Sequence, residues 1–229
     1  MRRIFIMLIV VIVINAPGIT SAFSLENKSP KILLIPREGP WGDIELMITK
    51  EAGVMISMLE ESGFIVKIAS ASGQDFVGAK TTLKSDMKLA EVEPSNYAGL
   101  IMPCMSSPDD LPIPPEATEI VDQLVKSGKP VAAQYGSVFI LAEAGVLAGR
   151  RYAMCYNAGF ADAIYVGNGV VQDGNIITSG ICPLMSVWGG LPDGTAKLTQ
   201  TLINELAYLF AVEPTGKLSV TWGNIKSKQ

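Results

Sequence analysis

A tyrosine occupies a position in residues 131–145 where the local pattern is typical of a catalytic nucleophile. Residues 131–133 form a short apolar strand, residues 134–137 (QYGS) form a tight turn, and an apolar helix follows over 138–144 before Gly145 ends it. A sharp turn from strand to helix lifts one side chain above the carboxyl edge of a sheet, beside the unpaired N–H groups of the helix amino end. Such elbows usually present Cys or Ser, whereas the apex here is Tyr135. A phenol with a pKa of about 10 is a poor nucleophile unless it is strongly activated.

The chain contains no histidine, which excludes several common kinds of catalytic site. Ser-His-Asp and Cys-His arrangements within one chain, and zinc sites built on imidazole, all require that residue. Histidine is also the side chain that most often transfers protons near neutral pH. Ser137 lies close to the apex, but no Gly-x-Ser-x-Gly motif surrounds it, so we expect a turn or helix-capping role.

The three cysteines are the remaining candidates for nucleophilic chemistry. Cys104 follows a predicted strand at 98–103, and Cys155 and Cys182 come at or after the ends of strands predicted at 150–155 and 175–179. Functional groups of parallel sheets gather at the carboxyl ends of the strands, so we expect all three thiols at one rim. An accessible thiol with a lowered pKa would be reactive, whereas buried thiols are usually inert.

Two further arrangements of the thiols follow from the same pattern. An exported chain meets oxidising conditions, and a disulfide between Cys155 and Cys182 is the favoured of the three single pairings. The cysteine spacing does not support a metal site made of three thiolates. We therefore predict neither a metal nor a cofactor.

Apolar strands and amphipathic helices alternate from Lys31 onward. Strands are predicted at 31–36, 65–70, 98–103, 131–133, 150–155, 170–173 and 175–179, with Asp173-Gly174 as the hairpin signal between the last two. Helices are predicted at 44–62, 116–127, 138–144 and 195–210, and residues 78–92 form a short hairpin or irregular excursion. This alternation predicts an α/β fold, a three-layer α/β/α sandwich with a mainly parallel sheet covered on both faces.

The amino-terminal residues are typical of an export signal. Arg2 and Arg3 precede an apolar run over 4–14, and small residues suited to cleavage end at Ala22. The run is short for a membrane span, so we expect a cleaved signal peptide over 1–22 and an exported protein, periplasmic or extracellular, with no membrane contact after cleavage. An uncleaved membrane anchor is the alternative. A linker over 23–30, one domain over 31–212 and a polar tail over 213–229 complete the predicted organisation.

Composition narrows the range of partners. Hydrophobic residues make up 48% of the 229 residues, enough for a substantial buried core. The formal net charge is −4, and no basic cluster occurs in the predicted domain, so binding to nucleic acid is not expected. A small-molecule ligand is kept as a candidate partner.

Several segments together resemble the ThiJ/PfpI family of the class I glutamine amidotransferase-like superfamily. The frame VAA at 131–133, LAEAGVL at 141–147 and GRR at 149–151 is similar to the elbow region of that family. Four further segments are similar to parts of that family. Residues 31–36 with Gly39 resemble its first strand and glycine loop, and residues 44–46 resemble the start of its first helix. Residues 97–103 resemble the strand that precedes its Gly-Gly pair, and residues 170–179 resemble its late hairpin and last strand. The resemblance covers most of the chain after the predicted signal, and it implies the flavodoxin-like version of the α/β sandwich.

The resemblance also implies roles for individual positions. Tyr135 would stand where family members carry the nucleophilic cysteine, Gly136 would replace an adjacent histidine, and Cys104 would occupy the slot of a Gly-Gly pair in the oxyanion site. Glu45 would be the carboxyl group that hydrogen-bonds the nucleophile, here paired with Tyr135 or a displaced thiol. An ordinary first-turn glutamate, favoured by the helix dipole, is the alternative. Family members commonly assemble, so a homo-oligomer is implied as well.

Three functions stay open on the sequence. The first is a non-catalytic binding or assembly protein that uses the former active-site cleft, with a ligand contacting Tyr135, Glu45, Cys104, Trp41 and Trp188; the two loop tryptophans could equally be packing covers. The second is a thiol-dependent hydrolase, amidase or glyoxalase-like enzyme that acts on a small carbonyl compound through Cys104 or Cys182. The third is redox or stress protection. A low-pKa, accessible thiol would favour the second and third.

Overall fold

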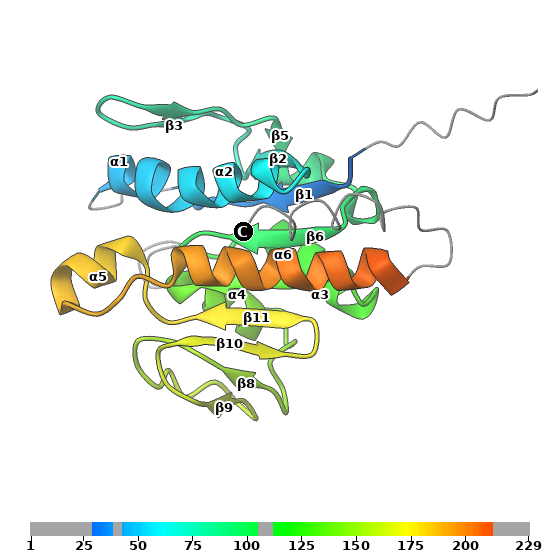
Figure 1. Cartoon of the computed structure of the whole chain (residues 1–229), viewed down its shortest axis with the longest axis vertical. Coiled ribbons are helices and arrows are strands. Elements are labelled where there is room, and N and C mark those ends of the chain that lie inside the picture. Colours follow the sequence, from blue (N-terminus) through cyan, green and yellow to red (C-terminus); the bar gives the residue numbers. More distant parts are fainter. Residues whose placement is uncertain (1–28, 39–42, 105–111, 213–229) are drawn as a thin grey trace, which may run out of the picture.

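A seven-stranded sheet forms the centre of the computed structural model, which describes residues 29–38, 43–104 and 112–212 (Figure 1). The strand order is β10-β11-β7-β6-β1-β2-β5, and every neighbouring pair is parallel except β10 and β11. The strands are β1 (Lys31–Leu34), β2 (Ile65–Ser70), β5 (Met87–Lys88), β6 (Gly99–Met102), β7 (Val131–Gln134), β10 (Val170–Asp173) and β11 (Ile176–Ser179). Helices form the crossovers from β1 to β2 and from β6 to β7, as the alternating pattern predicts, whereas residues 71–86, between β2 and β5, contain no helix.

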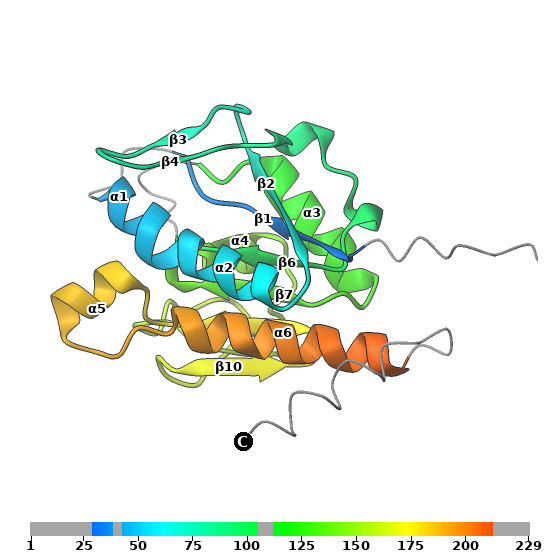
Figure 2. The same ribbon diagram turned by 45° about the horizontal axis from the view of Figure 1, so that its top comes forward.

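Helices cover both faces because alternate residues of each inner strand point to opposite sides of the sheet. Ile32 and Leu34 of β1 pack with α2 (Gly53–Glu61) and α6 (Thr195–Val212). Leu33 of β1 and Ile35 just beyond it pack with α3 (Pro115–Lys126) and α4 (Val138–Glu143). Figure 2 shows α2 and α6 lying side by side over one face, with α3 and α4 on the other. The predicted three-layer sandwich is confirmed.

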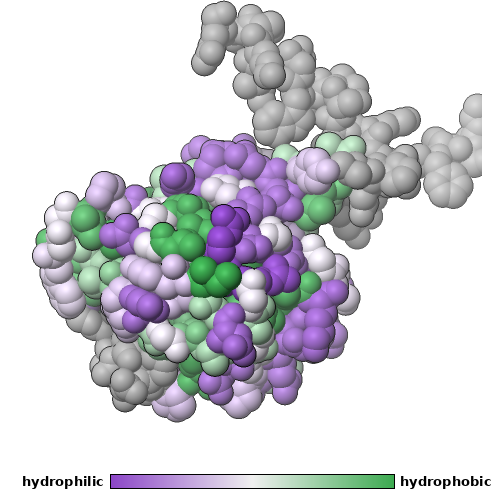
Figure 3. Space-filling view, turned by 90° about the horizontal axis from the view of Figure 1, so that it is seen from below, coloured by the Kyte–Doolittle hydropathy of each residue, from purple (hydrophilic) through white to green (hydrophobic). Residues whose placement is uncertain are grey.

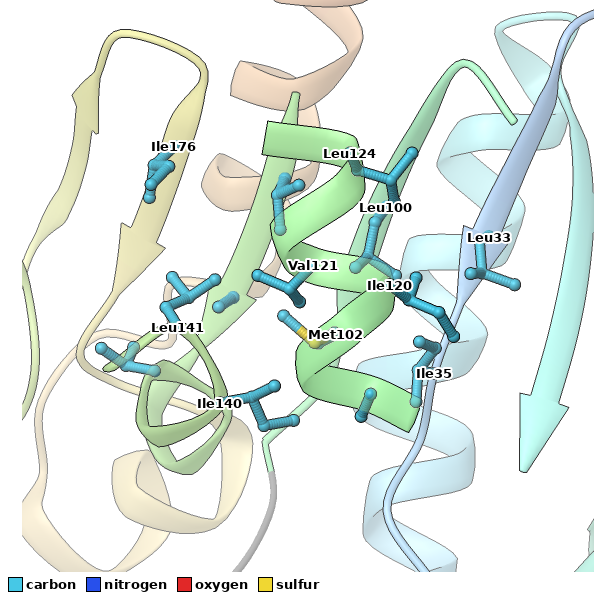
Figure 4. Close-up of a cluster of buried hydrophobic side chains, with 14 of the residues drawn as sticks. Leu33, Ile35, Leu100, Met102, Ile120, Val121, Leu124, Ile140, Leu141 and Ile176 are labelled. Carbon is cyan, nitrogen blue, oxygen red and sulfur yellow. The ribbon is translucent and has the colours of Figure 1, made fainter. Parts of the chain in front are cut away.

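The α3–α4 layer seals its side of the sheet with branched aliphatic side chains. Figure 4 shows Val121 and Leu124 of α3, with Ile140 and Leu141 of α4, converging on Leu100 and Met102 of β6. All of these are buried, and each buried side chain of this size contributes about 1.5–3 kcal/mol relative to its exposed state. The core therefore fixes the carboxyl ends of β6 and β7, where the candidate residues lie.

The first helical region is continuous but not uniform. α1 (Ile44–Leu46) begins at Asp43, whose carboxylate accepts the Leu46 N–H at 2.9 Å, and α2 ends before Gly63, at φ +88°. Between them η1 (Met47–Ala52) is π-helical. The predicted extent of 44–62 is confirmed, whereas the π-helical centre was not predicted. Such segments are rare and occur frequently at functional sites.

Several short elements differ from the prediction. The strand expected at 150–155 is only β8 (Arg151–Tyr152), which pairs with β9 (Ile164–Tyr165) outside the central sheet. Beyond it, the Ala153 N–H donates to the Thr178 hydroxyl and the Met154 N–H donates to the Gly167 carbonyl. The excursion contains the hairpin β3 (Phe76–Val77) and β4 (Thr82–Leu83) and then strand β5. The helix α5 (Pro183–Gly189) was not predicted.

The face around β8 and β9 mixes hydrophobic and hydrophilic side chains (Figure 3). Ile164 and Val166 are among its exposed apolar residues. None of the helices in the described ranges is both long and apolar enough to traverse a bilayer. The predicted signal peptide and polar tail, and most of the predicted linker, lie outside the described residues.

Candidate functional site

The predicted elbow is present at the end of β7. The strand passes into a single 3₁₀ turn, η4 (Tyr135–Ser137), and then directly into α4. Tyr135 has φ +45°, the left-handed region that costs a residue with a side chain about 1 kcal/mol. Ser137 is buried and its hydroxyl donates a hydrogen bond to the Pro103 carbonyl, which ties the turn to the end of β6. The strained backbone of an elbow is therefore retained with a bulky residue at its apex.

The surroundings of Tyr135 disfavour ionisation of its phenol. It is partly buried, and its hydroxyl donates a hydrogen bond to the sulfur of Cys155. Burial, then the bond to Cys155, raises the pKa of Tyr135 well above its ordinary value. Burial likewise raises the pKa of Cys155, although the tyrosine hydroxyl opposes that effect. Neither group is activated as a nucleophile.

Cys104 lies under the elbow, at the end of β6. Its N–H donates to Oε1 of Glu51 at 2.6 Å, and its sulfur accepts a hydrogen bond from the Gly136 N–H. Only 2% of the residue is exposed. Burial raises the pKa of the Cys104 thiol well above its ordinary value. The hydrogen bond that this thiol donates to Cys182 raises that pKa further. Cys104 is therefore a buried thiol that acts as a donor.

Cys182 receives that hydrogen bond and is the one described thiol whose pKa is lowered. The bond from Cys104 is the largest cause; the backbone N–H groups of Met185 and Leu184 add to it, and burial opposes them. Cys182 is the N-cap residue of α5, so the first N–H groups of that helix lie near its sulfur and help to lower its pKa, although none of them forms a capping hydrogen bond with the side chain. The residue is fully buried. The thiolate form of Cys182 is therefore favoured mainly by the Cys104 thiol.

Glu51 completes this cluster from the π-helical segment. The residue is 3% exposed, and burial raises the pKa of its carboxyl group well above the ordinary value, with the nearby Cys182 as the next cause. The Cys104 N–H opposes this shift by bonding the carboxylate form. A buried carboxyl group whose protonated form is favoured by its surroundings therefore shares a cavity wall with the two thiols.

Gln134, the last residue of β7, braces the loop that carries Cys182. Its side chain is fully buried, and Nε2 donates to the Ile181 carbonyl at 2.8 Å and to the Thr195 hydroxyl at 3.0 Å. These bonds connect β7 with the residue before Cys182 and with the start of α6. The elbow and the thiol pair are consequently parts of one rigid arrangement.

Two cavities adjoin these residues on opposite faces of the sheet. The smaller, about 10 Å³, lies between the first helical region and the start of α5, and its walls include Glu51, Cys104 and Cys182. That volume accommodates about one water molecule. The larger, about 290 Å³, lies between the end of β1 and helices α3 and α4. It is lined mainly by apolar side chains, among them Ile35, Leu89, Ala117 and Ile140.

The structure brings some of the predicted residues together and separates others. All three cysteines, Gly136 and Tyr135 do gather at one rim, as expected. Trp188 is 72% exposed on α5 and lines neither cavity, and Trp41 lies outside the described residues.

Two predictions about partners are wrong. Glu45 does not pair with Tyr135 or a thiol: its carboxylate accepts hydrogen bonds from the N–H groups of Lys80 and Thr81 and from the Thr81 hydroxyl, which holds it on the β3–β4 hairpin. These bonds lower the pKa of Glu45, with the Thr81 hydroxyl as the largest cause. The predicted Cys155–Cys182 disulfide is not present in the structure, in which all three cysteines are free.

Glu51 is the functional candidate that the sequence prediction missed. Its signal was a carboxyl residue within an apolar helical stripe: Met47, Ile48, Ala52 and Met55 are all buried on the same side. Charged residues are almost never fully buried unless they have partners. In the part of the chain that the structure describes, no three Cys, Asp or Glu side chains are placed to hold a metal ion.

A mainly parallel sheet with helices on both faces is the three-layer α/β arrangement of the class I glutamine amidotransferase-like fold. The chain belongs to the DJ-1/PfpI family, whose model matches residues 43–185. An uncharacterized protein of Archaeoglobus fulgidus is 36% identical over 154 residues, which cover 64% of this chain and 87% of the relative. Deglycase PfpI of Pyrococcus furiosus is 32% identical over 129 residues, covering 53% and 76%. The ThiJ/PfpI domain protein from Brachyspira murdochii has a similar fold, with a TM-score of 0.62 and 18% identity over 79% of this chain and 98% of that one.

Proposed function

We propose that this is an exported DJ-1/PfpI-family protein that binds a small, largely apolar molecule and performs no nucleophilic chemistry at its elbow. In this proposal Tyr135 takes the position of the family's catalytic cysteine. The observation that carries the proposal is the state of Tyr135: its hydroxyl is committed to Cys155, and its pKa is shifted further from neutrality. A phenol in that state is unsuited to attack a carbonyl carbon.

The cavity of about 290 Å³ is the binding site that we propose. Its size is close to the lower end of the range of about 300–1,000 Å³ that is usual for small-molecule sites. Ile35, Ala117 and Ile140 supply apolar walls, while Arg37 and Glu38 supply the polar part of the lining. Ser137, two residues after the elbow apex, also lines the cavity, which would connect ligand binding with the elbow. A compact apolar ligand with one polar end fits this lining.

A thiol-dependent enzyme acting on a small carbonyl compound is the competing candidate. The lowered pKa of Cys182 favours it, and several relatives are named deglycases. The space beside Cys182 opposes it, because a cavity of about 10 Å³ holds one water but no carbonyl compound. We therefore place ligand binding first.

The binding site is tested by filling the cavity. Indole serves as a small apolar probe, and its binding is measured by saturation-transfer NMR and by calorimetry. The variant Ala117→Leu introduces a larger side chain into the cavity wall, and we expect it to weaken indole binding about tenfold or more by excluding the probe. Ala207→Leu makes the same change on α6, across the sheet, and should bind like the parent.

Two results would contradict the proposal. Equal binding by both variants would place the probe elsewhere, and no binding at millimolar indole would argue against an apolar ligand site. The enzyme alternative is tested in parallel with methylglyoxal as substrate. Turnover that is lost in Cys182→Ser would replace our proposal with that alternative.

A further inference from the structure

Two thiols and a carboxyl group lie together on the face of the sheet opposite the proposed ligand cavity. Cys104, Cys182 and Glu51 line one cavity of about 10 Å³, and each is at most 3% exposed. The proposed ligand site uses none of them. Burying an ionisable cluster has a desolvation cost. Apolar side chains in place of these three would fill the same space without that cost.

The contacts within the cluster orient the two sulfurs toward each other. The Cys104 thiol donates a hydrogen bond to the Cys182 sulfur, and the Gly136 N–H donates to the Cys104 sulfur from the other side. The Cys104 backbone is anchored by its 2.6 Å bond to Glu51, and the Cys182 backbone is anchored by its carbonyl, which accepts the Ser186 N–H at 2.8 Å. The arrangement holds a donor thiol against an acceptor sulfur.

We propose that Cys104 and Cys182 form a redox-active pair that a hydroperoxide, with hydrogen peroxide as the smallest example, oxidises to a disulfide. Cys182 is the attacking thiol and Cys104 is the resolving thiol. This inference does not rest on the proposed ligand site, which lies on the other face of the sheet.

The reaction balances with groups that are present and one peroxide. The Cys182 thiolate attacks one oxygen of hydrogen peroxide and the O–O bond breaks, which gives a sulfenic acid on Cys182. The departing hydroxide takes the proton of the Glu51 carboxyl group and becomes water. The Cys104 sulfur then attacks the Cys182 sulfur, the S–S bond forms and the S–O bond breaks, and the Cys104 proton leaves with the second oxygen as water. The two sulfurs lose two electrons, and the peroxide gains them.

Size and hydrogen bonding select both the oxidant and the reacting pair. Hydrogen peroxide is closer in size to the one water that this cavity accommodates than an organic hydroperoxide or a carbonyl compound is. Cys182 lines the same cavity as Cys104, whose thiol lowers the pKa of Cys182, whereas burial raises the pKa of Cys155, which does not line that cavity. Cys155 is bonded to Tyr135 and takes no part in the proposed reaction.

The test follows the fate of each thiol in the full chain. Reduced protein is treated with one equivalent of hydrogen peroxide without oxygen, quenched with N-ethylmaleimide and mapped by peptide mass spectrometry without reduction. We expect the parent and Cys155→Ser to lose two thiols at equal rates and to yield a Cys104–Cys182 linked peptide. Cys182→Ser should lose its thiols about tenfold more slowly or worse. Cys104→Ser should stop at a sulfenic acid on Cys182 that dimedone traps.

Controls keep the result interpretable. Circular dichroism melting verifies that each variant is folded, and Cys→Ala replaces Cys→Ser at any position where serine prevents folding. If no variant of a given cysteine folds, the peptide map of the oxidised parent decides whether the Cys104–Cys182 link forms. A link that includes Cys155, or no link in the folded parent, would overturn the proposal. Glu51→Gln should slow oxidation without changing which cysteines are linked, and an unchanged rate would overturn the proton role of Glu51.

Discussion

At the scale of single residues, the elbow retains its geometry with a side chain that does not suit its usual chemistry. The φ of +45° at Tyr135 places the phenol at the apex, and the hydrogen bond to Cys155 fixes it there. A tyrosine at such a backbone conformation is strained, so packing and the surrounding turn must hold it. The turn itself is therefore expected to survive substitution at its apex.

The first prediction is that Tyr135→Cys creates a reactive thiol. In a Cys155→Ser background, which removes the adjacent sulfur, the new thiol would lie at the amino end of α4, where N–H groups favour a thiolate. We expect alkylation by iodoacetamide at pH 7 about tenfold faster than at any cysteine of the parent. Site-resolved mass spectrometry measures the rates, with Cys155→Ser alone as the control. Equal rates would show that the turn relaxes when Tyr135 is removed.

The second prediction concerns Glu51 and pH. Its pKa in the folded protein is raised above the ordinary 4.5, so the folded state binds a proton that the unfolded state has released. The stabilising contribution of protonated Glu51 to the free energy of unfolding is therefore complete below about pH 4.5, and it is lost as the pH rises through the pKa of Glu51 in the folded protein. Glu51→Gln cannot ionise and keeps an acceptor for the Cys104 N–H, so it should be more stable than the parent at pH 8, with the difference disappearing near pH 4.

Urea unfolding at pH 4, 6 and 8 measures this difference. Glu61→Gln, an exposed position at the end of α2, is the matched control and should follow the parent at every pH. A parent whose stability rises relative to Glu51→Gln between pH 4 and 8 would contradict a neutral Glu51.

Residue-level prediction from the sequence succeeded where it rested on topology and failed where it rested on a single position. Cys104 and Cys182 meet at one rim because β6 and β11 are parallel strands of the central sheet and end on the same edge. Cys155 follows β8, which pairs outside that sheet, so its place beside Tyr135 does not follow from this rule. Glu45 was chosen because it lies at the start of the first helix, but Glu51, six residues later and within the π-helical segment Met47–Ala52, is the carboxyl group that reaches the thiols. The partner of each thiol depends on side-chain directions that periodicity alone does not determine.

At the scale of elements, the β3–β4 hairpin is attached to the first helix through Glu45. Its carboxylate accepts the Lys80 and Thr81 N–H groups, and Gly78 packs so closely that an added Cβ would collide with the Glu45 carboxylate. The hairpin has only one pair of short strands, which are too few to be stable alone. Its order therefore depends on this contact.

The third prediction is that Glu45→Ala loosens the hairpin and leaves the central sheet intact. Amide hydrogen exchange in residues 76–83 should accelerate about tenfold or more, while exchange in β1 and β6 stays unchanged. Glu61→Ala, with no contact to the hairpin, serves as the control for loss of a helical carboxylate. Unchanged exchange in 76–83 would show that other contacts hold the hairpin.

Long apolar strands and amphipathic helices were predictable because burial imposes their periodicity, as in β2, whose predicted and observed bounds coincide. The helix α5 escaped prediction because its seven residues contain Pro, Gly and an exposed Trp, and a capping cysteine starts it. Its place in the fold comes from tertiary contacts with η1 and the loop braced by Gln134. Short elements that tertiary contacts stabilise have little signal in the sequence.

At the scale of the whole molecule, the fourth prediction concerns export. Expression of the full chain in a bacterial host should yield a protein in the exported fraction that lacks residues 1–22, with its formal charge changed from −4 to −6 by the loss of Arg2 and Arg3. Intact mass measures the cleavage point. Val10→Arg interrupts the apolar run and should leave the chain uncleaved. Full-length parent in the membrane fraction would support the anchor alternative.

The position of β7 has a consequence for the order in which the protein can fold. β7 lies between β6 and β11, and Ala132 is in register with Ile101 on one side and with Ile177 on the other. A ribosome releases the chain from its amino end, so β7 emerges well before the strand that pairs with its second edge. Until Ile177 arrives, that edge offers free N–H and C=O groups to any neighbouring chain. Aggregation of nascent chains should therefore peak in truncations that end between β7 and β11, and should fall sharply once β11 is complete.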